Sequence, residues 1–173
     1  IFYHGDGIEE VEIWNLVFTQ FNRVGPGQLE PLPSKNIDTG MGLERMAAAM
    51  QGVRSNFEID IFQPLVAAAS ESVGVPYDRD TRVGIRIRRI SDHARALTFC
   101  IHENVKPGPN EQGYVVRRLL RRAVLDAYQM GRREPFLSAI VPTVAEVMGR
   151  AYPELKDSVP RIQTVVKQEE EQF

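Results

Sequence analysis

The residues best suited to chemistry lie in the stretch NIDTGMGLERMAAAM. In it Asp38, Gly40 and Gly42 precede a run of strong helix formers that contains Arg45. Glycines just before a helix let a ligand approach the backbone where a side chain would collide. An arginine one turn into the helix can hold a fixed cation at the same place and bind phosphate oxygens. The pattern predicts a site for a phosphate-bearing ligand, although Asp38 or Thr39 would serve equally well as the helix N-cap.

A second candidate site lies on the alternating stretch VEIWNLVFTQF, which predicts a strand. Period-two alternation places Asn15 and Val17 next to each other on one face. A buried Asn needs partners for its amide, so it either joins a core hydrogen-bond network or faces a polar ligand. The pair would also suit a pocket wall for a small amino acid.

The elements that must position these residues change type near residue 41. Residues 1–38 have the pattern of β structure, with a Gly- and Pro-rich hairpin turn at RVGPGQLEPLPS and a short return strand ending near Ile37. Helical patterns follow. They cover about 41–50, 60–73, 85–103, 113–130, 135–149 and 158 to the end.

The Gly-, Pro- and Asp-rich break GVPYDRDT separates two regions, and we place a domain boundary there. The predicted fold is α+β. Residues 1–74 form a domain with a partial antiparallel sheet, and residues 75–173 form a mostly α-helical domain.

Charge is unevenly distributed along the chain. The net charge is −2, yet between Arg82 and Arg133 twelve basic residues stand against four acidic ones. The helix GYVVRRLLRRAVLDAYQM places four arginines within an arc of about 140°. A phosphate backbone would neutralise them, and so would acids such as Asp126 or Glu169–Glu171 packed from neighbouring helices. These arginines are Arg117, Arg118, Arg121 and Arg122.

Composition excludes several classes of protein. No apolar run approaches the ~20 residues of a membrane span, and no signal-peptide pattern is present, so we expect no membrane partner. One cysteine, Cys100, cannot form an internal disulfide, which favours a reducing, cytoplasmic setting. His4, His93 and His102 lack ligand-like spacing, so no zinc site is predicted. The chain starts without Met and stops within a helical pattern, so we expect a piece of a longer protein.

Five stretches resemble the alanyl-tRNA synthetase family, in the same order along the chain. They are EIWNLVFTQFNR, LPSKNIDTGMGLERMAAAMQG, SNFEIDIF, SDHARALTF and GYVVRRLLRRAV. The element GMGLER resembles motif 3 of class II aminoacyl-tRNA synthetases. The resemblance covers nearly the whole chain. It implies the C-terminal part of an aminoacylation domain, followed by a helical tRNA-recognition domain truncated at its C-terminal end.

The resemblance implies roles for the residues of the first two stretches. Arg45 would be the catalytic residue that binds the ATP triphosphate, and Gly40 and Gly42 would admit the nucleotide. The family's motifs 1 and 2 are missing here, so we expect the fragment alone to be poorly active. ATP chemistry in the complete enzyme would need Mg²⁺.

The alanine substrate would be held by the same region. By resemblance Asp38 would pair with the alanine ammonium, with Asn15 and Val17 lining the pocket and Gly40 beside it. Between Gly7 and Val11 the family usually carries a longer insertion, so this segment is expected to be either natively short or lacking residues.

The tRNA acceptor stem would face the arginine-rich region. By resemblance Asn110, in the loop KPGPNEQGY, would lie near the G·U pair by which the family identifies tRNA(Ala). The family's loop usually carries this Asn directly after Pro-Ser, and the loop here differs. The arginine-rich helix would contact the same RNA, with phosphates supplying affinity.

Three functions fit these observations. The leading hypothesis is part of an enzyme that activates alanine with ATP and transfers it to tRNA. The alternatives are a non-catalytic module that binds the RNA acceptor stem, and a structural helical domain whose arginines are internally paired. A truncated sheet leaves an exposed β edge, so we also expect self-association of the fragment.

Overall fold

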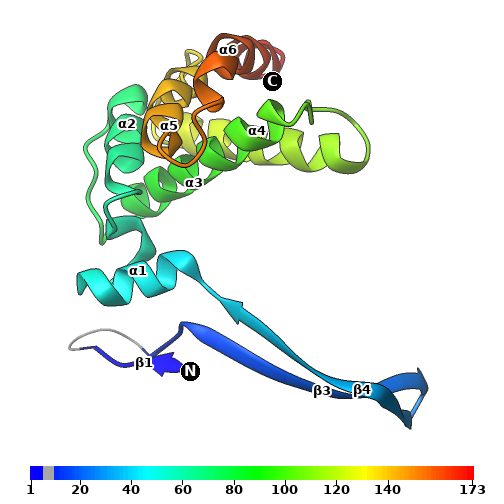
Figure 1. Ribbon diagram of the computed structural model, residues 1–173. Helices are drawn as coiled ribbons and strands as arrows, with labels where there is room; N and C mark the ends of the chain where they lie inside the picture. Colours follow the sequence, from blue (N-terminus) through cyan, green and yellow to red (C-terminus); the bar gives the residue numbers. More distant parts are fainter. Residues whose placement is uncertain (6–9) are drawn as a thin grey trace. The chain divides into compact units, whose positions relative to one another are not determined.

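The computed structural model describes residues 1–5 and 10–173. It divides into two compact units, Ile1–Ile59 and Asp60–Phe173. The first contains antiparallel strands and one α-helix, and the second is built from helices (Figure 1). The predicted α+β class is confirmed. The expectation about the segment from Gly7 to Val11 falls largely outside the described residues.

Along the sequence, the boundary between the two compact units lies earlier than the predicted domain boundary. The helix over residues 63–73 packs against the later helices, so the second unit begins at Asp60. The division into functional domains 1–74 and 75–173 stays a prediction.

The first unit contains two antiparallel strand pairs and a helix. The short strands β1 and β2 pair with each other, and the long strands β3 and β4 form a hairpin. A helix and a 3₁₀ turn complete the unit. The bounds are β1 Phe2–Tyr3, β2 Val11–Glu12, β3 Trp14–Gly25, β4 Gln28–Met41, α1 Leu43–Gln51 and η1 Asn56–Glu58.

The return strand β4 is longer than the short strand predicted from the sequence. Pro31 and Pro33 suggested an irregular turn, but a two-stranded ribbon has a free edge on each strand where a missing N–H is tolerated. The ladder shifts between Thr19 and Phe21, opposite the prolines. The actual turn lies at Gly27, whose φ of 73° is in the left-handed region that favours glycine.

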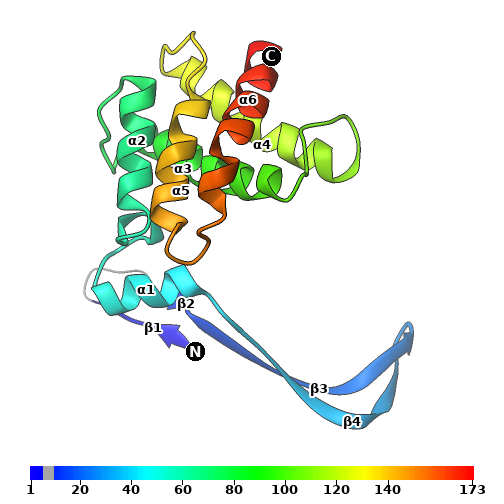
Figure 2. The same ribbon diagram turned by 45° about the horizontal axis from the view of Figure 1, so that its top comes forward.

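The hairpin exposes apolar side chains on both of its strands. Phe18 and Ile37, which are paired across it, are about two-thirds exposed, at 64% and 66%. Figures 1 and 2 show β3 and β4 as a twisted ribbon. Because exposed apolar strands with free edges pair readily, self-association remains an expectation.

The second unit packs its helices around α3. This helix contacts α2, α4, α5 and α6 (Figure 2). It buries the side chains of Ile87, Ile90, Leu97 and Ile101. Burial of each such side chain contributes roughly 1.5–3 kcal/mol. The bounds are α2 Gln63–Val73, α3 Arg82–His102, α4 Glu111–Gln129, η2 Leu137–Ile140, α5 Val141–Met148 and α6 Leu155–Glu171.

Most predicted helices of this unit are found with shifted ends. Thr81 caps α3 by accepting a hydrogen bond from the Gly84 amide at 3.1 Å, so the helix begins three residues before the predicted start at Ile85. Residues 137–140 form a 3₁₀ turn, so α5 is shorter than predicted. The last helix begins at Leu155, and Pro160 lies inside it. No helix in the described part of the chain combines the length and hydrophobicity that crossing a bilayer requires.

Candidate functional site

A small cavity of about 120 Å³ lies where the hairpin meets α1. It brings together four residues that the sequence singled out: Asn15, Gly40, Gly42 and Arg45. Glu12, Ile13 and Trp14 complete its lining. Since these residues come from β2, β3, β4 and the first turn of α1, the hairpin register decides whether the cavity exists.

The register places the predicted amino-acid-binding residues on one face of the hairpin. Asn15 pairs with Gly40, and Val17 pairs with Asp38. Directly paired residues in an antiparallel ladder share a face, and so do residues two apart. The four positions therefore form one contiguous patch, although Val17 and Asp38 do not line the cavity itself. Asp38 is exposed and has no hydrogen bond or ion pair with any described residue.

The backbone conformation at positions 40 and 42 does not require glycine. Neither has a positive φ, and Gly42, the N-cap of α1, has φ −76°. A Cβ at Gly40 would meet no described atom within 4 Å, so this position opens onto free space. A Cβ at Gly42 would lie 3.2–3.3 Å from the side-chain carbons of Arg45. Gly40 thus leaves room for a ligand, and Gly42 leaves room for the Arg45 side chain.

Asp38 and Thr39 do not cap the helix, so the N-cap alternative is wrong. Both residues lie in β4, and no side chain caps α1. The Thr39 hydroxyl instead accepts a hydrogen bond from the indole N–H of Trp14 across the hairpin. The strand continues to Met41 because its ladder with β3 continues to Trp14.

Glu12 connects the two key side chains of the cavity, and no pattern in the sequence singled it out. Its backbone carbonyl accepts a hydrogen bond from Arg45 Nη1 at 2.7 Å, and its carboxylate accepts one from Asn15 Nδ2 at 2.8 Å. Simple alternation puts Glu12 and Asn15 on opposite faces. The structure interrupts the strand at Ile13, between β2 and β3, and this break brings the two side chains together.

The four arginines of α4 fall into two pairs. Arg117 and Arg121 each donate a hydrogen bond from Nε to the same oxygen of Glu169 at 3.0 Å, and the side chain of Glu169 is only 7% exposed. Arg118 and Arg122 are exposed and have no hydrogen bond or ion pair with any described residue. The alternative that these arginines are paired within the protein therefore holds for two of the four, Arg117 and Arg121.

Asn110 stands at the N-terminus of α4 without capping it. Its backbone carbonyl accepts a hydrogen bond from the Tyr114 amide, but its side chain makes no cap hydrogen bond. The loop before it folds closely onto the helix, since a Cβ at Gly113 would lie 2.8 Å from the Lys106 carbonyl oxygen. The Asn110 side chain is exposed at the edge of a tightly held loop.

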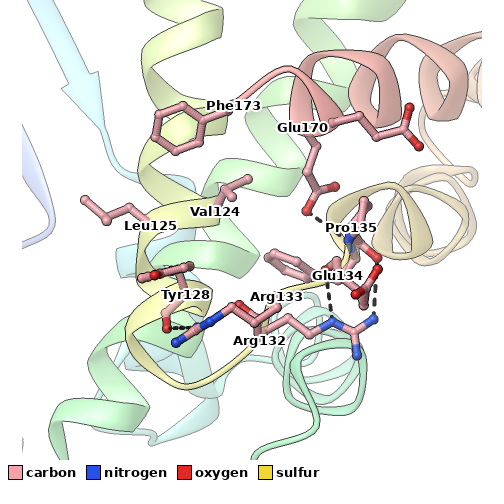
Figure 3. A pocket seen from close by; sticks show the side chains of 11 residues that line it. Val124, Leu125, Tyr128, Arg132, Arg133, Glu134, Pro135, Glu170 and Phe173 are labelled. Atoms are coloured by element: carbon pink, nitrogen blue, oxygen red, sulfur yellow. Dashed lines mark hydrogen bonds between the residues drawn. The ribbon is translucent and has the colours of Figure 1, made fainter.

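A larger cavity of about 550 Å³ lies between α4, the loop that follows it and the end of α6 (Figure 3). Tyr128, Arg133 and Phe173 are among its lining residues, and none of the predicted site residues belongs to it. The Arg133 guanidinium stacks over the Tyr128 ring, 3.7 Å from its centroid. At the same place the Glu170 carboxylate accepts hydrogen bonds from the Phe136 and Leu137 amides at 3.0 and 3.1 Å.

Glu170 should make stability depend on pH. Burial raises the pKa of Glu170, although the two amide hydrogen bonds oppose that shift. Because the folded state then binds the proton more tightly than the unfolded chain, stability falls as pH rises through the folded-state pKa. We expect Glu170→Gln to gain free energy of unfolding relative to wild type as the pH rises from 4.5 to 7.5, measured by urea titrations.

The matched control for this measurement is Glu146→Gln. Glu146 is an exposed carboxylate of α5, so its removal should leave the difference from wild type constant over the same pH range. An equal pH trend in both variants would contradict the assignment to Glu170.

No group of three or more His, Cys, Asp or Glu side chains lies close enough to hold a metal ion among residues 1–5 and 10–173. Near Arg45 the cavity offers one carboxylate, Glu12. Mg²⁺ prefers carboxylates together with substrate phosphates. The residues present do not form an Mg²⁺ site by themselves, and the absence of zinc stays a prediction.

Comparison with known proteins identifies relatives over the whole chain. A model of the protein family described as tRNA synthetases class II (A) matches residues 4–173. The alanine–tRNA ligase of Rhodopirellula baltica is 57% identical over 175 residues, covering 100% of this chain and 18% of that protein. Those of Chromohalobacter salexigens and Thermotoga maritima are 51% and 49% identical, covering 97% and 94% of the chain and 19% of each protein. The chain thus spans less than a fifth of the length of these curated relatives.

Proposed function

Because the chain belongs to the class II tRNA synthetase family, we propose that it is part of an alanine–tRNA ligase. The complete enzyme would activate alanine with ATP and transfer it to the 3′ end of tRNA(Ala). One observation carries the proposal: Asn15, Gly40, Gly42 and Arg45 meet at one cavity, beside Val17 and Asp38 on the same hairpin face. The names of the relatives supply the substrates.

Arg45 would bind the triphosphate of ATP during alanine activation. In this reaction an alanine carboxylate oxygen attacks the α-phosphorus, the bond to the bridging oxygen breaks, and pyrophosphate leaves. Negative charge grows on the leaving pyrophosphate, and a guanidinium held in place stabilises it. Arg45 is anchored by one donor, Nη1, on the Glu12 carbonyl, and each guanidinium carries five N–H donors. Other donors can therefore reach phosphate oxygens.

Asp38 and Asn15 would orient alanine. The Asp38 carboxylate, exposed and free of described partners, suits the alanine ammonium group. Val17 supplies an apolar neighbour on the same face for a methyl group. The Asn15 amide is held on Glu12, which fixes its carbonyl oxygen as a hydrogen-bond acceptor.

Mg²⁺ would accompany ATP in the complete enzyme, but no step of the proposal passes through it. Bound Mg²⁺ would neutralise phosphate charge. The residues of this chain that carry the activation step are Arg45 for the phosphates and Asp38 for the amine.

The helical unit would bind the acceptor stem of tRNA(Ala). Its support is the excess of arginines on α3 and α4 and the exposed Asn110 side chain at the start of α4. Of the four α4 arginines, Arg118 and Arg122 are better placed for RNA than Arg117 and Arg121, which share Glu169. The free cysteine Cys100 is consistent with a protein that functions in the reducing cytoplasm.

A chimaeric ligase tests the proposal directly. In it, this chain replaces the matching segment of the Rhodopirellula baltica enzyme, to which it is 57% identical. We expect alanine-dependent ATP–pyrophosphate exchange within about tenfold of the parent enzyme, because cores tolerate hydrophobic substitution when patterning is kept. A folded chimaera that binds acceptor-stem RNA but shows no exchange would favour the non-catalytic RNA-binding module instead.

Gly40→Val in the chimaeric ligase separates a substrate site from a simple turn. A Cβ at this position meets no described atom within 4 Å, and the position needs no positive φ, so we expect the fold to be preserved. A side chain there would project into the proposed site, and we expect exchange to fall at least 100-fold, as misplacement by about 1 Å already costs that much. Gly25→Val, at the hairpin turn, is the matched control. Equal activity in the two variants would refute a ligand beside Gly40.

A further inference from the structure

The side of the helical unit where α3 meets the C-terminal half of α4 contains a notch, and half of its lining residues are arginines. The notch has a volume of about 220 Å³, room for several waters at ~30 Å³ each. Its three arginines, Arg82, Arg86 and Arg89, lie about one helical turn apart on α3, so they share one side of that helix. The lining residues are Arg82, Ile85, Arg86, Arg89, Asp126 and Gln129.

One buried carboxylate organises this notch but cannot neutralise it. The Asp126 side chain, 8% exposed, accepts hydrogen bonds from Arg89 Nη1 at 3.0 and 3.2 Å and lies 3.6 Å from Arg86 Nε. Arg86 also donates to the Gln129 side chain. Arg82 is exposed and has no hydrogen bond or ion pair with any described residue. Three guanidinium groups against one carboxylate leave a surplus of two positive charges.

The exposed arginines of α4 lie on the same side as the notch. At 100° per residue, Arg118, Arg122 and Gln129 fall within about 40° of one another around the helix axis. Gln129 lines the notch and accepts a hydrogen bond from Arg86, so the side of α4 that contains Gln129 is the side that faces the notch. From residue 118 to residue 129 the helix rises about 17 Å. Arg118 and Arg122 thus extend the notch into a line of cations along α4.

The acids of both helices do not cancel this line. Asp92 on α3 is engaged by His93 and lies 3.9 Å from Arg95. On α4 the acids are Asp126, within the notch, and Glu111, in the first turn. Like charges one turn apart on a helix are unfavourable unless a counter-charge is present. The arrangement calls for an extended anion with several regularly spaced charges.

We infer that Arg82, Arg86, Arg89, Arg118 and Arg122, here called the arginine track, bind successive phosphates of an RNA backbone. The notch holds one phosphate between Arg82 and the guanidinium groups that Asp126 orients, and Arg118 and Arg122 contact phosphates farther along. Arginine suits this task because its planar donors match phosphate oxygens bidentately. The inference rests on the proposed function, to which it adds Arg82, Arg86 and Arg89 as RNA contacts and from which it removes Arg117 and Arg121.

The test is RNA binding by the full 173-residue chain, measured by fluorescence anisotropy with a labelled acceptor-stem duplex over a range of KCl concentrations. We expect Arg82→Gln, Arg118→Gln and Arg122→Gln each to weaken binding several-fold. Each should also lower the slope of log K against log salt by about one, because one phosphate contact is lost. All three side chains are exposed, so circular dichroism should remain unchanged.

The control is Arg150→Gln, which removes one exposed arginine after α5 and changes net charge equally. Its binding and salt slope should stay close to wild type. Equal losses in Arg150→Gln and Arg82→Gln, an unchanged slope in Arg82→Gln, or no salt-dependent binding by the wild-type chain would each overturn the inference. ATP–pyrophosphate exchange needs no tRNA, so these outcomes are distinguishable from a failure of the proposed ligase activity.

Discussion

Replacing Arg45 by alanine in the chimaeric ligase is expected to lower alanine-dependent ATP–pyrophosphate exchange by about 10³-fold. Loss of a preorganised donor that stabilises developing charge typically costs 10²–10³-fold, and here the donor is a full cation. Arg45 lines the cavity beside Gly40 and is held there by its 2.7 Å hydrogen bond to the Glu12 carbonyl. The exchange rate with saturating alanine and ATP is the measurement.

Two further variants separate the phosphate role of Arg45 from its structural one. Arg45→Lys keeps the charge but loses the planar fork, so it should recover part of the exchange activity. Arg23→Ala removes an exposed arginine from the same hairpin and should leave exchange near wild type. Exchange within tenfold of wild type for Arg45→Ala, with an intact circular dichroism spectrum, would mean that this arginine only fastens α1 to the strand before it.

Short-range patterns in the sequence predicted part of the cavity. Alternation over β3 correctly put Asn15 and Val17 on one face, and the onset of helix formers placed Arg45 near the start of a helix, which begins at Leu43, two residues later than predicted. Both patterns depend on local geometry, which the sequence specifies directly. The hairpin register then brought Gly40 opposite Asn15.

Contacts that depend on tertiary structure escaped prediction. Glu12 reaches Asn15 and Arg45 only because the strand breaks at Ile13, and nothing in the alternating pattern indicated that break. Likewise, periodicity placed the four α4 arginines in one arc but could not divide them. The division depends on Glu169, about 50 residues later, whose buried carboxylate takes Arg117 and Arg121 together.

The other large effect is expected from Asp38→Asn, which should raise the KM for alanine by roughly 10- to 150-fold in the exchange assay. The change preserves side-chain size and removes the charge that would pair with the alanine ammonium. A hydrogen bond to a charged group is worth roughly 1.5–3 kcal/mol, and 1.36 kcal/mol corresponds to tenfold. Asp38 is exposed and has no partner among the described residues, so the substitution should not alter the fold.

The KM for ATP distinguishes an alanine-binding Asp38 from a general weakening of the site. Since Asp38 lies on β4 opposite Val17 and does not line the cavity of Arg45, the KM for ATP should stay within about threefold of wild type. Glu30→Gln, which neutralises another exposed acid of β4, should change neither constant. Equal increases in both KM values for Asp38→Asn would mean that its carboxylate stabilises the hairpin and does not bind alanine. A selective increase for alanine would assign this face of β3 and β4 to the amino acid and the turn into α1 to the nucleotide.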